Sequence, residues 1–165
     1  MNQIPQAAVA IIEVFDEGQR HWLILQRKLS LQDKWSGQLC FAGGKYESSD
    51  VDLLETAIRE TLEETQIQLT RDQCVHVLDD RTAGQGRILI RSFLFKIPQK
   101  VEFILNLAEM EKGWWVSESE FKNSQEFQFA PIAERPDFKT TGRMIQNQIL
   151  WGFTLRLMNE VCTNY

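Results

Sequence analysis

The chain has 165 residues, of which 43% are hydrophobic and 25% are charged. A chain of this length can bury most of its apolar surface without disulfides or metals, and its composition argues against a disordered segment or a coiled coil. The 18 Lys and Arg residues against 23 Asp and Glu residues give a net charge of −5, which argues against non-specific binding to a phosphate backbone. We therefore expect one globular domain over residues 1–165.

The cysteines and the apolar segments exclude further classes. Cys40, Cys74 and Cys162 are odd in number and form no CxxC pair, which fits neither a disulfide framework nor a structural zinc site. The N-terminus lacks the basic start of a signal peptide, and the longest apolar stretch, residues 7–12, is too short to span a bilayer. The sequence therefore predicts a soluble, cytoplasmic protein.

The N-terminal third has the pattern of strands. Residues 7–15 and 21–27 are rich in apolar and β-branched side chains, and the turn residues Asp16-Glu17-Gly18 separate them, which predicts a β-hairpin. Residues 39–41 form a short apolar strand that leads into Ala42-Gly43-Gly44, a break that requires a permissive backbone.

The sequence changes period between residues 52 and 65. Apolar or small residues recur there at i, i+1, i+4, i+5, i+8 and i+9, which is one broad face of a helix: Leu53, Leu54, Ala57, Ile58, Thr61 and Leu62. Ser49 or Asp50 can cap the first turn. We therefore expect an amphipathic helix in this segment.

The rest of the chain alternates between strand-like and helical patterns. The predicted strands are residues 74–78, 88–97, 101–105 and 114–116. Ser117 and Glu120 have the spacing of a capping box that opens a brief helix. Residues 135–142 have the composition of a loop, and apolar residues at helical spacing predict a C-terminal helix over about 144–161. Many strands with two long helices indicate an α+β fold on a mixed sheet.

Three carboxylates lie on one side of the first helix. At about 100° per residue, Glu60, Glu63 and Glu64 fall within an arc of roughly 100° at the border of the buried face. Like charges at this spacing repel, and partial burial increases the cost unless a cation lies among them. Oxygen ligands favour Mg²⁺ or Mn²⁺ over zinc.

A second interpretation of these carboxylates needs no metal. They can form a solvated acidic face in which Arg59 pairs with Glu55 or Glu63. The preceding Gly43-Gly44 favours the metal, because glycines at the end of a strand let the backbone approach a ligand and offer it a carbonyl. This order of features is suited to a metal-bridged phosphate.

The segment from Gly43 to Ile67 resembles the Nudix box, the pyrophosphohydrolase motif with core REUxEExGU. Arg59-Glu60 and Glu63-Glu64 match that core without a gap, and Ile67 fills its last apolar place. Residues 35–44 and 149–154 are similar to segments of the coenzyme A pyrophosphatase branch. The resemblance implies a single-domain, Nudix-like α-β-α sandwich with a mixed β-sheet and its box at residues 43–67.

The box departs from the usual pattern at three positions: Ala42 stands for the Pro before Gly-Gly, Val51 for the Glu eight positions before Arg59, and Gln66 for the Gly near the box end. Gly44 lies fifteen residues before Arg59, one more than is common. This longer loop, which contains Asp50 and Asp52, is itself similar to the coenzyme A branch. Metal chemistry is therefore better supported than coenzyme A as the substrate.

The resemblance implies roles for individual residues. Glu60, Glu63 and Glu64 would ligate the metals, the Gly44 carbonyl would complete the shell, and Arg59 would hold the carboxylates in place.

The general base stays open between three candidates. Glu109 occupies a place that resembles family members with an acidic residue there, although an exposed loop Glu would look the same. Glu64 or a metal-bound hydroxide could also serve. The candidate substrate-binding residues are Arg27, Trp35 and Lys45.

The function implied is hydrolysis, with Mg²⁺ or Mn²⁺, of a nucleoside diphosphate linked to another moiety. Coenzyme A or a derivative, cleaved to 3′,5′-ADP and 4′-phosphopantetheine, is the expected substrate. The alternatives are ADP-ribose, dinucleotides or oxidised nucleotides, and a catalytically silent nucleotide-binding domain. The expected partner is a small nucleotide, not a nucleic acid polymer or a membrane, and a homodimer is compatible with the sequence.

Overall fold

The computed structural model describes residues 4–31, 35–84, 88–132 and 135–165. Its centre is a mixed β-sheet around β1 (Ala7–Asp16), which pairs antiparallel with β2 (Gln19–Arg27) and parallel with β7 (Ile88–Ile97). The predicted hairpin is confirmed. Its two turn residues, Glu17 and Gly18, both have positive φ, as a tight turn between adjacent strands requires.

Further strands extend the sheet on both sides. β3 (Leu39–Cys40) pairs with β2, and β4 (Ala42–Lys45) pairs with β1. Both pairs lie where β1 and β2 are no longer paired to each other. β8 (Met110–Ser117) pairs with β2, while β5 (Cys74–Val77) and β6 (Arg81–Ala83) pair with β7.

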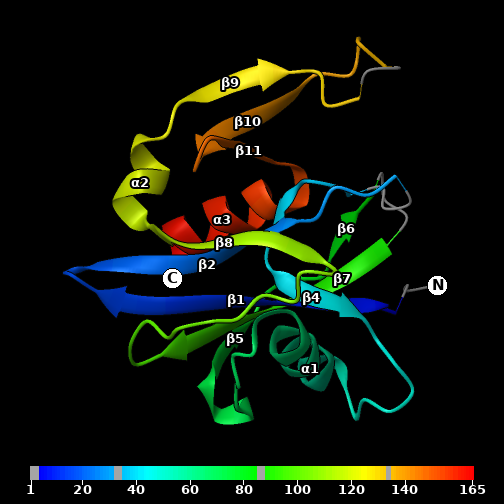
Figure 1. The fold of residues 1–165 in the computed structure, drawn as a ribbon, viewed down its shortest axis with the longest axis vertical. Helices are drawn as coiled ribbons and strands as arrows, with labels where there is room; N and C mark the ends of the chain where they lie inside the picture. The colour runs from blue at the N-terminus through cyan, green and yellow to red at the C-terminus, as the bar shows by residue number, and fades with distance from the viewer. Residues whose placement is uncertain (1–3, 32–34, 85–87, 133–134) are drawn as a thin grey trace.

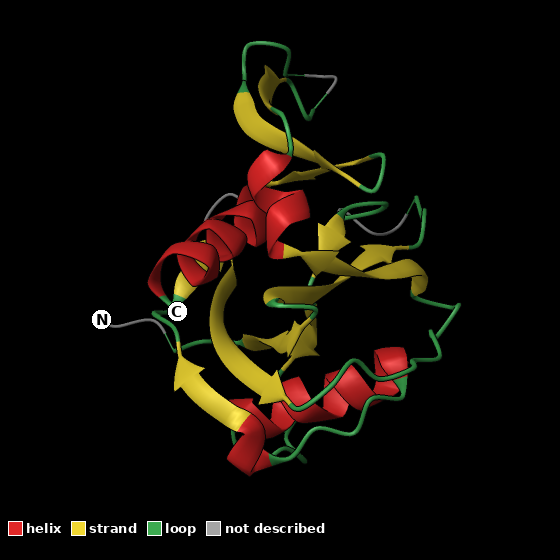
Figure 2. Ribbon diagram, turned by 90° about the vertical axis from the view of Figure 1, so that its left-hand side faces the viewer, coloured by secondary structure: helices red, strands yellow, loops and turns green. Residues whose placement is uncertain are grey.

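Two long helices cover opposite faces of this sheet (Figure 1). α1 (Leu53–Thr65) packs through Ala57 against a core that includes Phe93 and Phe95. α3 (Gly152–Asn164) packs on the other face, where Leu157 lies in a cluster with Trp22. The view in Figure 2 shows the same three layers. The predicted α-β-α sandwich with a mixed sheet is therefore confirmed.

The C-terminal part carries a second, smaller sheet on the α3 side of the molecule, away from α1 (Figure 1 and Figure 2). It contains β9 (Glu126–Phe129), β10 (Thr140–Ile145) and β11 (Gln148–Trp151). The predicted brief helix is confirmed as α2 (Glu118–Asn123), and the Ser117 hydroxyl accepts from the backbone N–H of Glu120 at 3.1 Å. A single 3₁₀ turn, η1 (Arg71–Gln73), precedes β5.

The prediction of one helix over 144–161 was wrong in its first half. Residues 140–145 and 148–151 form a hairpin, so the predicted loop over 135–142 also ends earlier than expected. Gln146 and Asn147 both have positive φ, 51° and 59°, which is the backbone of a two-residue hairpin turn and not of a right-handed helix. The helix begins only at Gly152.

The predicted strand over 101–105 was also wrong. This segment forms no strand, and it bonds to the end of α1 instead: Ile104 N–H donates to Thr65 O at 2.9 Å. The last carbonyls of a helix have no partner within it, so a neighbouring segment can supply the missing donors.

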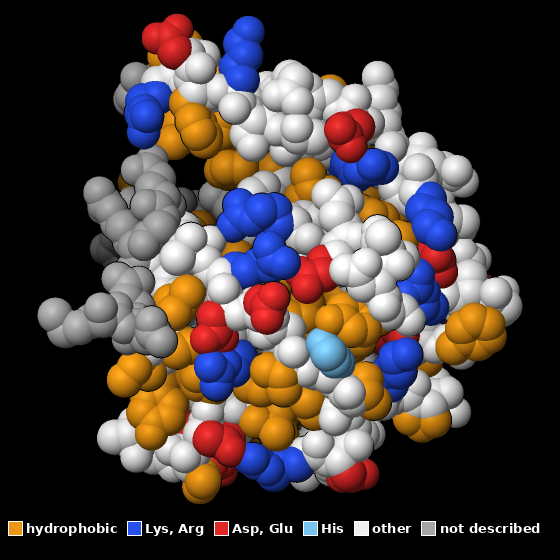
Figure 3. Space-filling view, turned by 180° about the vertical axis from the view of Figure 1, so that it is seen from behind, with side chains coloured by type: hydrophobic (Ala, Val, Ile, Leu, Met, Phe, Trp, Pro, Cys, Tyr) orange, Lys and Arg blue, Asp and Glu red, His pale blue; other side chains and the backbone are white. Residues whose placement is uncertain are grey.

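Charged side chains are mixed on the surface of the molecule. On the face seen in Figure 3, Lys and Arg lie among Asp and Glu. The ion pairs of the molecule include Arg91 with Asp80 at 2.8 Å and Arg20 with Glu118 at 2.9 Å. Among the described residues, no helix is long and apolar enough to cross a membrane.

Candidate active site

Each of the two glycines of β4 leaves room for a neighbouring element, Gly43 for β1 and Gly44 for α1. A Cβ atom at Gly43, whose φ is 154°, would collide with the backbone of β1. A Cβ atom at Gly44 would overlap the carboxylate of Glu60. Gly43 and Gly44 are therefore required because backbone and carboxylate both need the space that a side chain would fill.

Helix α1 is fixed at both ends. Asp52, and not Ser49 or Asp50 as predicted, caps its first turn by accepting from Glu55 N–H at 2.9 Å. Its last turn ends at Gln66, which has a φ of 60°, the left-handed conformation that glycine usually supplies.

The three predicted carboxylates differ in exposure along this helix. Glu64 is 1% exposed, and its carboxylate accepts from Gly43 N–H at 3.0 Å. The Glu60 side chain is 14% exposed and the Glu63 side chain 54%. The predicted arc at the border of the buried face is therefore confirmed, with Glu64 at its inner end and Glu63 at its outer end.

Arg59 connects this arc to the loop before the helix. Its guanidinium donates to both carboxylate oxygens of Asp50, at 2.8 and 3.1 Å, and to Lys45 O at 3.1 Å. It also pairs with Glu60 at 3.0 Å and with Glu63 at 3.3 Å. The resemblance implied that Arg59 orients the carboxylates, and a guanidinium with these contacts is suited to that role.

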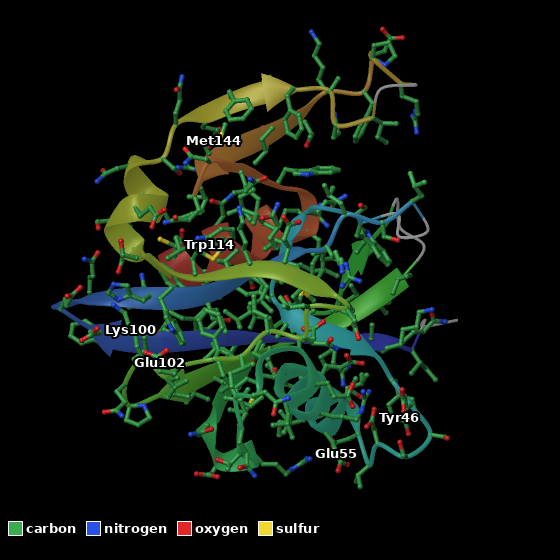
Figure 4. All side chains as sticks on the ribbon, viewed as in Figure 1. Tyr46, Glu55, Lys100, Glu102, Trp114 and Met144 are labelled. Atoms are coloured by element: carbon green, nitrogen blue, oxygen red, sulfur yellow. The ribbon has the colours of Figure 1, made fainter. Side chains whose placement is uncertain are left out.

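Asp50 was noted in the sequence, but its pairing with Arg59 was not predicted. It is 5% exposed and accepts from Thr56 Oγ1 at 2.8 Å and Glu47 N–H at 3.0 Å. Tyr46, in the same loop (Figure 4), donates to its carbonyl at 3.0 Å. The Arg59 guanidinium holds the pKa of Asp50 well below its usual range, and the pKa of Arg59 is raised in return. The sequence feature that could have indicated this ion pair is an acidic residue in the loop before Arg59-Glu60.

Burial makes the inner carboxylates unusual acids. The pKa of Glu64 is raised to about 8, chiefly by burial and also by the charges of Glu60 and Glu109, while the Gly43 N–H and Arg27 act against this rise. Burial also raises the pKa of Glu60, against Arg59. Carboxylates held in this state are poised to gain from a cation or to exchange a proton.

The structure brings Glu109 to this cluster. It is exposed on the turn before β8, and its charge acts on both Glu60 and Glu64. Asn106 Nδ2 donates to the Glu109 carboxylate at 3.2 Å. Glu109 is therefore an exposed loop residue that also neighbours the candidate site.

The predicted substrate-binding residues lie on three different segments of the chain. Arg27 ends β2 on the side of α1, and its charge acts on Glu64. Lys45 is exposed at the end of β4, next to the glycines. Trp35 is half-buried in the segment before β3.

The donor set fits a hard divalent cation by its chemistry. Its oxygens come from three carboxylates and from the backbone beside Gly44, and two of the carboxylates have raised pKa values. Among the described residues, however, no three acidic, histidine or cysteine side chains already surround one point. Glu60 and Glu63 are turned to Arg59, so they would have to exchange that contact for the cation.

The comparisons with known proteins agree with this geometry. The family model described as the NUDIX domain matches residues 4–135. Three curated relatives are an uncharacterized protein of Schizosaccharomyces pombe (32% identical), the uncharacterized Nudix hydrolase NudL of Photorhabdus laumondii (24%) and the peroxisomal coenzyme A diphosphatase ndx-8 of Caenorhabditis elegans (29%). The alignments cover 67%, 84% and 73% of this chain, and 40%, 74% and 52% of the relatives.

Solved structures show the same fold. A MutT/nudix family protein from Enterococcus faecalis aligns with a TM-score of 0.62 at 15% identity, over 96% of this chain and 61% of that one. An Ap4A hydrolase complex from C. elegans aligns with a TM-score of 0.55 at 19% identity, over 70% and 83%. With its box residues on β4 and α1 and its fold shared with these structures, the chain belongs to the Nudix family.

Proposed function

We propose that this protein is a metal-dependent hydrolase that cleaves the diphosphate between a nucleoside and another group. The observation that carries the proposal is the buried carboxylate of Glu64, held by the Gly43 N–H between two further acidic residues. A carboxylate in such surroundings destabilises the fold unless a cation or a proton compensates it. Membership of the Nudix family supports the choice of a cation, Mg²⁺ or Mn²⁺.

Glu60, Glu63 and Glu64 would hold the cation, together with the Gly44 carbonyl. A bound divalent cation neutralises the negative diphosphate oxygens and lowers the pKa of a bound water. In the metal-free protein Arg59 pairs with Glu60 and Glu63, which would exchange this contact for the cation, while Asp50 keeps Arg59 beside them. We assign the side chains of Arg27 and Lys45 to the phosphates of the substrate. Trp35 is assigned to the adenine of the nucleotide.

We assign the general base to Glu109. A base must reach the attacking water, so a carboxylate that holds the cation is less free to serve. Glu109 is exposed, whereas Glu64 is buried and is assigned to the cation, so Glu64 is the poorer candidate. The hydrogen bond from Asn106 to the Glu109 carboxylate holds that carboxylate next to the acidic arc.

Coenzyme A or an acyl derivative is the substrate we propose. The support is the similarity to the relative named as a coenzyme A diphosphatase and the longer loop with Asp50 and Asp52 in the box. The expected products are 3′,5′-ADP and 4′-phosphopantetheine.

A substrate panel tests both levels of the proposal. Purified protein with Mg²⁺ or Mn²⁺ is given coenzyme A, ADP-ribose, NADH, dinucleoside polyphosphates and nucleoside triphosphates, and product release is measured. We expect coenzyme A or its acyl form to have the highest kcat/KM. A tenfold preference for ADP-ribose, about 1.4 kcal/mol in transition-state binding, would exclude coenzyme A as the substrate. The proposal of metal-dependent hydrolysis would still stand. No turnover of any compound would favour a silent nucleotide-binding domain.

A further inference from the structure

Asn106 uses all of its polar groups to join the end of α1 to the turn that carries Glu109. Its N–H donates to Glu64 O at 2.9 Å, and its carbonyl accepts from the N–H groups of Glu109 and Met110 at 3.0 and 2.8 Å. Its side-chain Oδ1 accepts from Ala108 N–H at 3.1 Å, and Nδ2 donates to the Glu109 carboxylate at 3.2 Å. One residue therefore contacts the backbone of Glu64 and the side chain of Glu109.

The orientation of the Asn106 amide follows from these partners. The Ala108 N–H needs an acceptor, so the oxygen must face it, and the NH₂ group then faces Glu109. A donated hydrogen bond to a carboxylate favours one rotamer of a side chain that is otherwise exposed. The Asn106 amide therefore fixes the rotamer of Glu109 and with it the position of the carboxylate.

The other side of the turn is held by β2. The N–H of Lys28, which follows this strand, donates to Glu109 O at 2.8 Å, and the Lys28 ammonium donates to Leu107 O at 2.9 Å. The backbone of the turn is thus fixed between two elements, and Asn106 adds control of the side chain.

We infer that Asn106 is a positioning residue that holds the carboxylate of Glu109 in register with the acidic arc of α1. The inference rests on the proposed function, in which Glu109 is the general base. Asn106 itself touches neither substrate nor cation. A base must lie within hydrogen-bond reach of the proton that it takes, so a carboxylate that leaves this rotamer lowers the rate without changing substrate affinity.

Asn106→Ser tests this role. A serine hydroxyl can still accept from Ala108 N–H within the turn but cannot reach Glu109. We expect kcat to fall on the order of tenfold or more, with KM within about twofold. A second variant, Asn106→Asp, keeps the acceptor and places a negative charge beside Glu109, so it should lower kcat at least as far. The matched control is Asn159→Ser on the exposed face of α3, which should keep the wild-type kcat.

A double-mutant cycle separates positioning from general support of the fold. Glu109→Gln alone should lower kcat by about 10²-fold, and adding Asn106→Ser to it should cost no more than about twofold, because the carboxylate to be positioned is gone. Thermal unfolding with and without Mg²⁺ checks that each variant is folded and still responds to the ion.

The kinetics of these variants either support or overturn the positioning role of Asn106. The inference is overturned if the two substitutions reduce kcat independently, if Asn106→Ser keeps wild-type kcat, or if Glu109→Gln stays within a fewfold of wild type. All three outcomes leave the hydrolase function intact, because the wild type still turns over. A wild type without activity on the panel overturns the proposed function and the positioning role with it.

Discussion

At the scale of single residues, the buried Glu64 makes the stability of the metal-free protein depend on pH. Its folded-state pKa of about 8 lies above the value of about 4.3 for an unfolded chain. Between these values the folded protein keeps a proton that the unfolded chain has released. The free energy of unfolding therefore decreases as the pH rises through this window, and the Glu64 penalty disappears below it.

Glu64→Gln should for this reason stabilise the metal-free protein. The amide keeps an oxygen for the Gly43 N–H but has no charge to bury, so at pH 8 we expect a gain of about 1 kcal/mol or more. Near pH 4.5 the gain should vanish. Urea unfolding with EDTA at several pH values measures it, and Glu63→Gln, at an exposed position of the same arc, should change stability by only a few tenths of a kcal/mol. A less stable Glu64→Gln at pH 8 would mean that the carboxylate is a structural partner.

Asp50 has the opposite dependence on pH. Arg59 lowers its folded-state pKa below the unfolded value of about 3.9, so the pair stabilises the protein fully above that pH and less as the pH falls below it. Asp50→Asn should cost about 1–3 kcal/mol at pH 7, because a buried, charge-assisted contact is lost. The deficit relative to wild type should shrink below pH 4. Asp72→Asn, an exposed control in η1, should cost little at any pH. A deficit that does not change with pH would assign the cost to the shape of the loop.

At the scale of elements, the end of α1 shows a departure from the family pattern. Gln66 stands where the box usually has glycine, and it has a φ of 60°. A side chain is strained in this left-handed conformation, and glycine is not. Gln66→Gly should therefore raise the free energy of unfolding by about 0.5–1 kcal/mol. The same change at exposed Gln68, which has no positive φ, should not stabilise, and chemical denaturation compares the two. Equal effects at both positions would rule out relief of backbone strain.

Local periodicity predicted the elements whose environment is regular. The face through Ala57 and Thr61 predicted α1, and the turn at Gly18 predicted the first hairpin. Periodicity failed where tertiary partners decide the conformation. Ile104 lies in a strand-like run whose backbone bonds to a helix end, and the turn at Asn147 interrupts a pattern that reads equally as helix or strand.

The same distinction applies to the residues of the candidate site: some could be predicted from local periodicity, and others depend on the tertiary structure. Glu60, Glu63 and Glu64 could be located because they share one helix, where spacing fixes direction. The partnership of Asp50 with Arg59 depends on the path of an irregular loop, which no periodicity encodes. Asn106 and Glu109 lie about forty residues after α1 in the chain, and only the folded structure brings them to its end.

At the scale of the whole molecule, the sheet separates two sets of contacts. One face packs against α1 and carries the candidate site, and the other packs against α3 (Figure 1). The site is thus built from β4, α1 and the turn before β8, three elements whose backbones all join the core sheet or bond to one another. An ion bound there would connect these elements and act on the stability of the entire fold.

The last prediction concerns this linkage between the ion and the fold. An ion that binds only the folded state raises the free energy of unfolding by about 2.7 kcal/mol at 100 times its Kd, which for a chain of this length is about 5–10 °C in Tm. Wild type should show such a rise with Mg²⁺ or Mn²⁺, and Glu63→Gln should show much less, since it lacks one proposed ligand. Glu102→Gln makes the same charge change at an exposed position that lies near Lys100 and far from Tyr46 (Figure 4), so it should respond like wild type. If the Glu63 and Glu102 variants respond alike, the ion acts through general screening of the negative charge, and the carboxylates of α1 are a solvated acidic face paired with Arg59.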